Sequence, residues 1–369
     1  MKKTGMILLM MILSMALMVA CGSDEEVNGN GVENEQQEAD QEGTDQEGAD
    51  QEGTDQEKEP KENEQAETEN EGEAFEVKVA APAGAPTLSM IRMFKEEPSF
   101  GERAEVEYES VQSPDLMASR ILSGEVDIAV VPTNLAASLY QRGADFQLAA
   151  SSVWGILYML GNEEISDWED LKGRDIHTLG RGLTPDIILR HVLSFNGIDP
   201  DEDVTLHYMG GATELASAFI SGQIDLAVIP EPAVSKVLMN REDARVLYDL
   251  QEEWSKSTEG EDAYPQASLI IHKDLIENER AFVEAFLAEY KSSIDWLFEN
   301  RETAGEYSEE LGIGMKKGVV VQGLDRMNID YQSASEARDA IDTYFEVLLE
   351  ASPKTVGGQA PDDGFYFDN

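Results

Sequence analysis

Two stretches of twelve residues repeat one pattern of apolar and polar positions along the chain: ILSGEVDIAVVP at residues 121–132 and FISGQIDLAVIP at residues 219–230. Each begins with the apolar end of a helix and stops at Ser-Gly. Each then continues from an Asp into a run of buried-strand residues that a Pro closes. The pattern therefore predicts the same unit twice: a helix, a turn, a strand, and a loop at the carboxyl end of the strand.

The repeat extends well beyond these two stretches. A shift of 98 residues places Val77 on Asp175, Val106 on Val204 and Ser123 on Ser221. Both copies predict the order strand, helix, strand, helix, strand. The predicted strands are residues 77–84 and 104–111 in the first copy and 175–180 and 204–211 in the second, each pair followed by a signature strand. This order predicts an α/β protein of two similar lobes, each a parallel sheet flanked by helices, with right-handed crossovers.

Two further apolar segments lie between and after the copies, SSVWGILYMLG at residues 151–161 and QASLIIHK at residues 266–273. We expect them to cross between the lobes as a two-strand hinge over a cleft. The chain beyond them is expected to be helical, because apolar residues recur at steps of three and four from Phe282 to Phe298. The expected divisions are residues 76–157 for the first part of lobe 1, residues 158–265 for lobe 2, and residues 266–369 for the return to lobe 1 with the C-terminal helices.

The first 75 residues or so differ in composition from the rest. Residues 1–20 carry Lys2 and Lys3 before a short apolar run, and Cys21 follows as the only cysteine of the chain. This arrangement is typical of an export signal rather than a membrane anchor, and one cysteine excludes a disulfide framework or a thiolate metal cluster. Residues 21–75 are dominated by acidic, amide, Gly and Thr residues with a repeated DQEG(A/T) unit. Such a segment cannot form a core, so it is expected to be a disordered acidic tether.

The charge of the chain is strongly negative, with a formal net value of −48. Residues 22–76 contain 22 acids against Lys58 and Lys61, and the leader adds two lysines, so residues 77–369 carry −30. Nucleic acid and anionic membrane surfaces are poor partners for such a protein. We expect the surplus to act as a solubility device in a salty or alkaline medium, where salt screens the self-repulsion.

Several segments together carry a family resemblance: both signature stretches, the hinge segment SSVWGILYML, the run LIIHKDLIENERAFVEAFLAEYKSSIDWLFEN, and the terminal PDDGFYF. Over residues 75–369 the chain resembles the substrate-binding lipoproteins of ABC importers, which have the type II periplasmic-binding-protein fold. It is most similar to the NMT1/THI5-like group for nitrate, sulfonate, taurine and thiamine precursors. The residues around Cys21 resemble a bacterial lipobox.

This resemblance implies an extracytoplasmic monomer without a cofactor, anchored in the cell membrane by a lipid on Cys21. Such a protein captures a small organic or anionic solute between its lobes and delivers it to an importer permease and its ATPase. Two alternatives remain open. One is an enzyme of the same fold, of the pyrimidine-precursor or menaquinone-pathway type, against which the export signal argues. The other is a lipid-anchored ligand sensor.

The candidate binding residues follow from the predicted sheets, because ligands of open α/β sheets bind in the crevice beyond the carboxyl ends of the strands. The helices after these loops are expected to begin at Thr87, Ser113, Thr184 and Thr213. The hinge segment adds two residues beside the crevice. The candidate ligand-binding residues are Gly84, Ala85, Pro86, Ser113, Pro132, Thr133, Asn134, Trp154, Gly155, Arg181, Gly182, Thr184, Gly211, Thr213 and Glu231.

Opposing features leave the charge of the ligand open. Free amides at the helix starts, with Arg181 beside them, favour a carboxylate or sulfonate, although Arg181 also fits a solvated loop residue. Glu231 would suit an amine or a ring N–H donor, or be a solvated loop acid. Trp154, with Tyr158 behind it, either stacks on a planar ligand or is a core residue.

Neither catalysis nor metal binding is indicated. Asp127 and Asp225 are a matched pair, but each opens its strand at the end opposite the crevice, where an acid satisfies backbone amides. The four histidines show no metal-ligand spacing. No Gly-rich phosphate loop or dinucleotide fingerprint occurs. The sequence therefore favours a binding protein over an enzyme.

Overall fold

The computed structural model describes residues 73–111, 114–260 and 263–368. All of them belong to one compact unit, Glu69–Asn369. The expected export signal, the lipid attachment at Cys21 and nearly all of the acidic tether lie outside the described residues, and so does Ser113. No helix within the described ranges is long and apolar enough to span a bilayer.

The first sheet orders its strands β11-β4-β10-β3-β1-β2. The strand bounds are Phe75–Pro82 (β1), Ala104–Val111 (β2), Ile128–Pro132 (β3), Phe146–Trp154 (β4), Pro265–His272 (β10) and Ile329–Ser333 (β11). β1 pairs in parallel with β2 and β3. β10 runs antiparallel to β3 and β4, and β11 runs antiparallel to β4. The parallel part is therefore the strand repeat seen in the sequence, and the crossing and return strands extend it.

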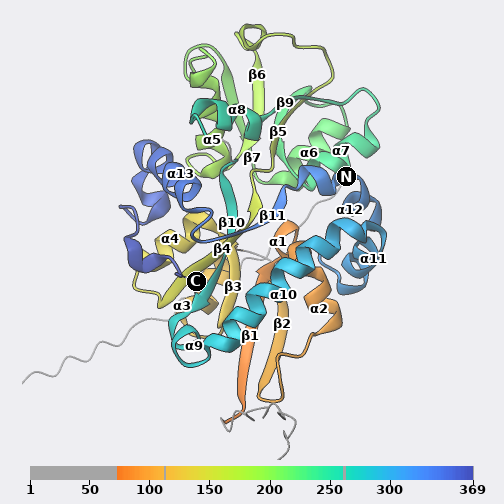
Figure 1. Cartoon of the computed structure of the whole chain (residues 1–369). Coiled ribbons are helices and arrows are strands. Elements are labelled where there is room, and N and C mark those ends of the chain that lie inside the picture. Colours follow the sequence, from red (N-terminus) through yellow and green to blue (C-terminus); the bar gives the residue numbers. More distant parts are fainter. Residues whose placement is uncertain (1–72, 112–113, 261–262, 369) are drawn as a thin grey trace, which may run out of the picture. The chain divides into compact units, whose positions relative to one another are not determined.

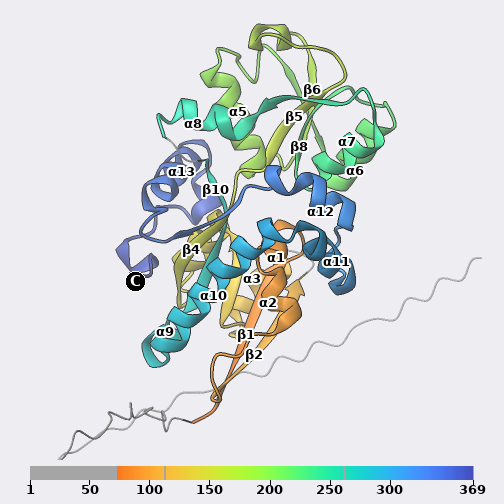
Figure 2. The same ribbon diagram turned by 45° about the vertical axis from the view of Figure 1, so that its right-hand side comes forward.

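The second sheet has the order β7-β6-β8-β5-β9. Its strands are Leu157–Gly161 (β5), Asp175–Leu179 (β6), Thr205–Met209 (β7), Leu226–Pro230 (β8) and Arg245–Asp249 (β9). β6 pairs in parallel with β7 and β8, and β5 runs antiparallel to β8 and β9. We call the part built on the first sheet the first lobe and the part built on the second sheet the second lobe (Figures 1 and 2).

Helices follow the strands as the sequence pattern predicts. The first lobe begins with α1 (Ala85–Ser89), α2 (Ile91–Glu96), α3 (Pro114–Leu122) and α4 (Thr133–Gln141). The second lobe has α5 (Thr184–Phe195), α6 (Ala212–Ile220), α7 (Ala233–Asn240) and α8 (Leu250–Ser257), with the short helix η1 (Trp168–Leu171). The return segment, residues 273–368, has α9 (Lys273–Asn278), α10 (Arg280–Glu299), α11 (Arg301–Leu311), α12 (Lys317–Gly323), η2 (Leu324–Arg326), α13 (Arg338–Ala351), η3 (Pro353–Val356) and η4 (Asp363–Phe365).

The central strands of the first sheet are buried on both faces, which explains the continuous apolar runs of β3, β4 and β10. Val79 and Val130 pack on one face with Phe286 and Tyr290 of α10, so the apolar stripe predicted in that helix is a packing surface. Figure 1 shows α10 lying along the sheet. On the other face, alternate residues such as Val131 pack against α3 and α4.

The internal duplication is visible in the backbone. β3 and β8 begin and end 98 residues apart. Just before β3, the Oδ2 of Asp127 accepts a hydrogen bond from the N–H of Lys78 at 2.8 Å. Just before β8, the Oδ1 of Asp225 accepts from Nδ2 of Asn162 at 2.8 Å and from Nη2 of Arg241 at 2.7 Å. Both acids therefore hold neighbouring chain segments at the amino ends of the strands, which confirms their structural role.

The chain crosses between the sheets twice. It leaves the first sheet at Trp154 and enters the second at Leu157, and it returns from Asp249 through α8 to Pro265. β4 and β10 pair along most of their length, so the two crossings lie side by side in the first sheet. This arrangement confirms the expected fold of two α/β lobes joined by a two-strand hinge.

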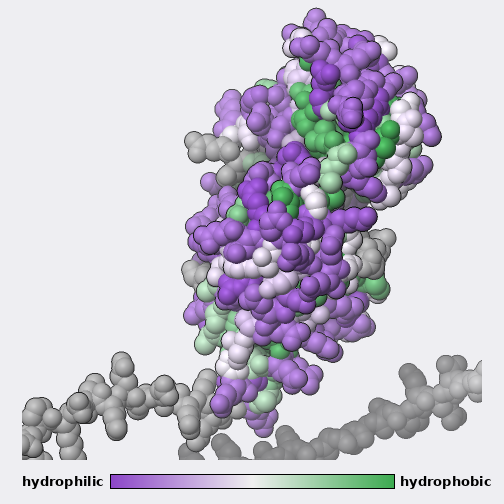
Figure 3. Space-filling model, turned by 90° about the vertical axis from the view of Figure 1, so that its right-hand side faces the viewer, coloured by the Kyte–Doolittle hydropathy of each residue, from purple (hydrophilic) through white to green (hydrophobic). Residues whose placement is uncertain are grey.

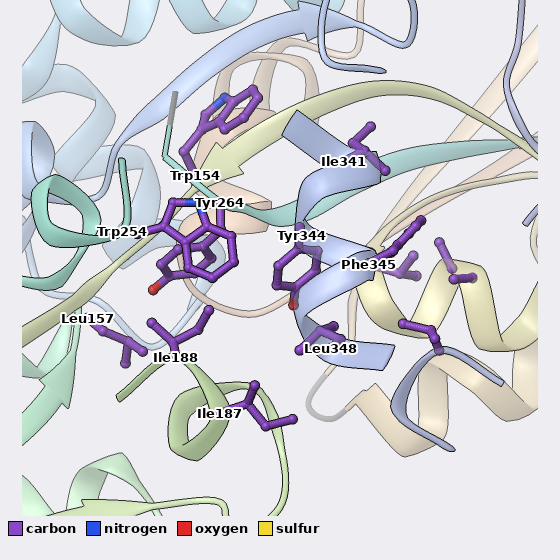
Figure 4. Packing of buried hydrophobic residues seen from close by; sticks show 14 of the residues in the cluster. Trp154, Leu157, Ile187, Ile188, Trp254, Tyr264, Ile341, Tyr344, Phe345 and Leu348 are labelled. Atoms are coloured by element: carbon purple, nitrogen blue, oxygen red, sulfur yellow. The ribbon is translucent and has the colours of Figure 1, made fainter. Parts of the chain in front are cut away.

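An aromatic cluster packs beside the double crossing. The rings of Trp254, Tyr264 and Tyr344 have centroids 5.5 to 6.2 Å apart. Figure 4 shows them with Ile188 of α5. These residues belong to one buried cluster that also contains Leu157. The apolar core is therefore continuous from α13 of the return segment to α5 and α8 of the second lobe.

The structure departs from expectation in three ways. Each sheet is mixed rather than wholly parallel, because the crossing and return strands add antiparallel partners. β11 lies in a region expected to be helical: Ile329 and Tyr331 alternate with Asp330 and Gln332, but this alternation covers only four positions between helices. Two helix starts differ from the expected ones: α5 begins at Thr184 as expected, but α1 begins at Ala85 rather than Thr87 and α6 at Ala212 rather than Thr213. Their N-cap residues, Gly84, Leu183 and Gly211, provide no side-chain cap.

Candidate functional site

A cavity of about 620 Å³ opens between α5 of the second lobe and α13 of the return segment. We call it the α5–α13 pocket. Its lining residues are Arg181, Gly182, Asp186, Ile187, Arg190, His191, Ser194, Asp201, Val347, Glu350, Ala351 and Ser352. Arg181 and Gly182 are candidate residues of the sequence, and they lie in the loop at the carboxyl end of β6. The volume lies within the range of small-molecule sites, about 300–1,000 Å³.

Asp186 organises the α5 wall of the pocket. Its side chain is only 5% exposed, and it accepts hydrogen bonds from the N–H of Gly182 at 2.7 Å, Nε of Arg190 at 2.9 Å and the hydroxyl of Tyr208 at 2.7 Å. Nη1 of Arg190 also donates to Asp201 at 2.8 Å. Because these groups satisfy one another, the wall is held in one arrangement, and the charge of Arg190 is neutralised within the protein.

Arg181 has a different environment. Its side chain is exposed, and its guanidinium carbon lies 4.5 Å from the ring centroid of Tyr208. No carboxylate among the described residues lies within ion-pair distance of it. A cation over an aromatic face is held by the ring quadrupole while its N–H groups remain available. The contact with Tyr208 therefore fixes the position of the Arg181 guanidinium, while its N–H groups remain available as hydrogen-bond donors.

The α13 wall supplies a carboxylate. Glu350 is exposed on the last turn of α13, and no ion-pair partner of it occurs among the described residues. Burial lowers the pKa of His191 below its ordinary value of 6.5, although the charge of Glu350 acts in the opposite direction. His191 is therefore neutral at pH 7, and its Nε2 is hydrogen-bonded to Ser257 at 2.8 Å. Among the described residues, Glu350 and Arg181 are thus the charges of the pocket without an ion-pair partner.

Two helix starts expected to bind an anion are already used by carboxylates of the protein. At α5 the N–H of Gly182 donates to Asp186, as described above. At α6 the N–H of Gly210 donates to Glu214 at 2.9 Å. Gly211 precedes that helix, and Thr213 is exposed in its first turn. The free amides expected at these positions are therefore not all available to a solute.

Thr184 also has a structural contact. Its hydroxyl lies 3.2 Å from the hydroxyl of Tyr344 and its side chain is buried. This pair joins the start of α5 to α13 of the return segment. Thr184 therefore helps to pack α5 against α13, and it does not itself line the pocket.

The candidate residues of the first lobe lie apart from the pocket lining. Gly84 has φ 113°, a conformation that favours glycine, and it begins α1 with Ala85 buried and Pro86 partly exposed. Pro132 is partly exposed before α4. The structure brings these loops to the carboxyl ends of β1 and β3, as predicted.

The next two candidates in the first lobe are held by contacts within the protein. The hydroxyl of Thr133 is buried and lies 2.8 Å from that of Ser268. Nδ2 of Asn134 donates to the carbonyl of Thr355 at 3.2 Å. That bond ties the start of α4 to η3, the segment that follows α13. These two residues therefore position neighbouring segments rather than present free polar groups.

Trp154 is a core residue. Its side chain is 4% exposed, and Nε1 donates to the carbonyl of Asp330 at 3.1 Å. Gly155 is needed beside it, because a Cβ there would lie 2.7 Å from the ring of Tyr264. The alternative in which Trp154 stacks on a solute has no support in this geometry, and the hydroxyl of Tyr158 donates to the carbonyl of Arg326 at 2.9 Å.

Glu231 is buried and fully paired, which corrects the expectation that it offers a free carboxylate. It is 2% exposed. Its Oε1 accepts from Nε of Arg326 at 2.6 Å and from the Ser235 hydroxyl at 2.8 Å, and its Oε2 accepts from the N–H of Ser235 at 3.0 Å. A solute amine would have to displace these donors. Glu231 therefore connects the second lobe to the return segment.

The described residues contain no cluster of three or more His, Cys, Asp and Glu side chains able to hold a metal ion. His177 and His207 do stack, with ring centroids 4.9 Å apart, and His207 is hydrogen-bonded to Asp175 at 3.0 Å. They lie at one register position on the paired strands β6 and β7. This contact is a cross-strand pair of the sheet.

Sequence reasoning missed most of the pocket. Asp186 and Arg190 carried one usable signal, because acid and base four residues apart on a predicted helix form an ion pair. Glu350 and Ala351 carried none, because α13 is brought to α5 only by the packing of the return segment. Arg326 was missed for the same reason: it lies 95 residues from its partner Glu231.

A family model described as "NMT1/THI5 like" matches residues 103–304, more than half of the chain. YtlA of Bacillus subtilis (strain 168), which is named a binding protein, is 25% identical over 139 residues, 36% of this chain and 42% of that protein. The match therefore spans less than half the length of this curated relative.

Solved structures have a similar fold. An ABC transporter structure from Parabacteroides distasonis is 27% identical, covers 79% of this chain and 98% of its own, and has a TM-score of 0.70. The aliphatic sulphonate binding protein SsuA of Escherichia coli is 16% identical, with coverage of 80% and 94% and a TM-score of 0.58. The nitrate-binding protein NrtA of Synechocystis PCC 6803 is 12% identical, with coverage of 77% and 84% and a TM-score of 0.56.

The last two likenesses concern the fold, which is that of type II periplasmic binding proteins. The family match covers the second half of the first strand repeat, the whole second lobe and the beginning of the return segment. On this evidence the chain belongs to the NMT1/THI5-like family.

Proposed function

We propose that this protein is an extracytoplasmic solute-binding protein, without catalytic activity, that captures a small solute and delivers it to the permease of an ABC importer. The α5–α13 pocket is the observation that carries this proposal. Its walls come from two parts of the chain that the double crossing connects, α5 of the second lobe and α13 of the return segment. A solute held there contacts both parts at once.

Capture is coupled to the arrangement of the lobes. The chain passes from β4 to β5 through Gly155 and Ile156, and it returns from α8 to β10, so a change of lobe angle is absorbed at these two connections. A solute that contacts α5 and α13 better in one arrangement shifts the population toward that arrangement. The permease then distinguishes the loaded protein from the empty one by its shape.

The anchor belongs to the same proposal. A lipid on Cys21 would hold the protein at the extracytoplasmic face of the membrane, and the acidic segment after it would let the folded part reach the permease. Replacement of Cys21 by Ser should release the protein from the membrane fraction. Retention of that variant in the membrane fraction would contradict the lipid anchor.

The binding function is tested with a panel of small solutes and two tryptophan variants. Ala351→Trp places an indole in the pocket from an exposed position, and Glu346→Trp places one on the same helix outside the lining. A solute that raises the melting temperature of the wild type should also stabilise Glu346→Trp but leave Ala351→Trp unchanged. Stabilisation of Ala351→Trp as large as that of the wild type would place binding elsewhere.

Transport and catalysis are separated by two further readouts. X-ray scattering should show a change of dimensions when a stabilising solute is added, since binding selects one lobe arrangement. The solute should be recovered unchanged after long incubation with the purified protein. Recovery of a converted product would favour the enzyme alternative instead.

A further inference from the structure

Two histidines stack on the second sheet, outside the lining of the α5–α13 pocket. His177 of β6 and His207 of β7 lie opposite each other in the parallel register, with ring centroids 4.9 Å apart and ring planes 19° apart. Nε2 of His207 lies 3.0 Å from Oδ1 of Asp175, the first residue of β6. Histidine is the side chain whose ordinary pKa puts its change of charge between pH 5 and 8. The two strands are therefore joined by two titratable rings in direct contact.

His177 is poorly placed to carry a proton. Its Nδ1 is buried and has no hydrogen-bond partner among the described residues. A protonated imidazole donates from both nitrogens, so the Nδ1–H of a charged His177 would face no acceptor there. Burial lowers the pKa of His177 below its ordinary value of 6.5, and the charge of His207 lowers it further. The backbone of Leu226 and the charge of Asp175 oppose this shift but do not cancel it.

His207 is better placed to carry a proton. Its contact with Asp175 becomes an ion pair when the ring is protonated. The hydrogen bond with His207 lowers the pKa of Asp175 below its ordinary value of 3.8, so this carboxylate stays charged in weak acid. The first proton that enters the pair is therefore held between His207 and Asp175. A second proton, on His177, would put positive charges on two rings 4.9 Å apart, and like charges at this distance repel each other.

The other charged groups on the elements around the pair are already bound. Helix α6 covers this face of the sheet, since Leu179 and Met209, each two residues further along its strand, pack with α6. The one ionisable side chain of α6, Glu214, accepts from a backbone N–H just after β7 at 2.9 Å. Asp225, just before β8, accepts from Nη2 of Arg241 at 2.7 Å. Within the described ranges, the acid at the start of β6 is therefore the charged partner of the pair.

Tyr208, the next residue of β7, contacts the α5 wall of the pocket from the other face of the sheet. Its hydroxyl donates to Oδ1 of Asp186 at 2.7 Å and accepts from Nη2 of Arg190 at 3.3 Å. Its ring centroid lies 4.5 Å from the guanidinium carbon of Arg181. In the described sheet β7 is an edge strand that pairs with β6. The strand that carries His207 therefore also holds the α5 wall in place.

We propose that His177 and His207 form an acid-sensitive switch in the second lobe. While the pair holds no proton or one, the rings stack and β7 stays on β6. Uptake of the second proton separates the rings, and β7 yields because it is the edge strand of the sheet. Tyr208 then withdraws from Asp186 and Arg181, which releases the α5 wall. The consequence for a solute rests on the proposed function, whereas the release of the strand does not.

The direction of the pH dependence follows from the paired and the released arrangements of β7. Above pH 6.5, the ordinary pKa of histidine, His177 is neutral in both arrangements. Below it, the released arrangement takes up the proton first, because the pKa of His177 in the stack is lower. The paired arrangement therefore has its full stability above pH 6.5 and loses it as the pH falls through this value toward the lowered pKa.

Hydrogen exchange of the purified full chain, without any solute, tests the switch at about pH 7.5 and about pH 5, on either side of the ordinary histidine pKa. Three variants are compared with the wild type at each pH, so the intrinsic pH dependence of exchange cancels. His177→Phe keeps a ring in the stack that cannot be charged. His207→Gln keeps a neutral donor near Asp175 and removes one charge. His191→Gln removes the other histidine of the second lobe, whose pKa is also lowered by burial.

Acid should raise exchange in residues 205–209 and 181–186 of the wild type about fourfold or more relative to His177→Phe, the Boltzmann factor for two unit charges 4.9 Å apart in water. His207→Gln should show a smaller rise, because the buried Nδ1 of His177 remains. His191→Gln should match the wild type. The NMR signals of the His177 ring should titrate below pH 6.5.

Three results overturn the switch: an equal acid effect in His177→Phe and the wild type, a rise spread over both lobes instead of these two segments, or loss of the rise in His191→Gln. If His177→Phe does not fold, His207→Gln decides, because a rise equal to that of the wild type would show that the charges of the two rings do not interact. No solute enters this experiment, so the solute panel and Ala351→Trp decide solute capture separately.

Discussion

At the scale of single residues, the largest revision concerns Glu231. Its position after a repeated strand predicted a loop acid near the crevice. Glu231 does lie directly after β8, but its carboxylate is bound by Arg326 instead of being free. Its partner Arg326 is 95 residues away, and no local sequence pattern predicts such a contact.

The structural role of Asp127 and Asp225 was predictable, because the direction of their strands places them at the end opposite the crevice.

The pairing of Glu231 can be tested with Arg326→Met. This change removes the ion-pair partner of a carboxylate that has no exposed side-chain surface, which should lower the free energy of unfolding by about 3 kcal/mol. Arg301→Met breaks a similar contact, 2.8 Å from Asp325, but there the acid side chain is 69% exposed. That loss should stay below about 1 kcal/mol. Urea denaturation measures both, and equal losses would refute the distinction.

At the scale of secondary-structure elements, the pattern of the sequence predicted most strands and helices correctly. The repeated strand–helix units have strong apolar runs and Gly stops, so their existence and order were clear. β11 and the packing of α13 were not predictable. The alternation of β11 spans only Ile329 to Gln332, too few residues to set it apart from the helices around it. The position of α13 depends on contacts with Trp254 and Tyr264 far along the chain.

The role of α13 can be tested at Tyr344, which joins it to the second lobe. Tyr344→Ala removes a buried ring from the aromatic cluster (Figure 4) and should cost about 3–5 kcal/mol of stability. Tyr344→Phe loses only the contact with Thr184 and should cost about 1 kcal/mol. Hydrogen exchange should increase in α5 only in the Ala variant. Unchanged exchange in α5 would show that the two helices are not coupled.

At the scale of the whole molecule, the chain is strongly acidic, with a formal net charge of −48. Figure 3 shows one side of the folded part, mostly hydrophilic, with apolar side chains gathered on its upper portion. The sequence was sufficient to predict the two lobes, their crossing and the strand-end loops. It was not sufficient to find the pocket, because one pocket wall comes from a helix whose placement depends on tertiary packing.

The acidic surplus has a measurable consequence. Residues 77–369 carry −30, and the repulsion among these charges is weakened by salt, whose screening length falls to about 3 Å at 1 M. Added sodium chloride should therefore raise the melting temperature of the protein. Calorimetric scans over a salt series measure this. A melting temperature that stays constant or falls would contradict the view of the surplus as an adaptation to salt.

The central claim, capture of a solute in the α5–α13 pocket, is tested most directly by native mass spectrometry of the protein purified from cells. The full chain and Glu346→Trp should carry the same small molecule, and Ala351→Trp should carry none. The same molecule bound to Ala351→Trp at the wild-type level would contradict the claim.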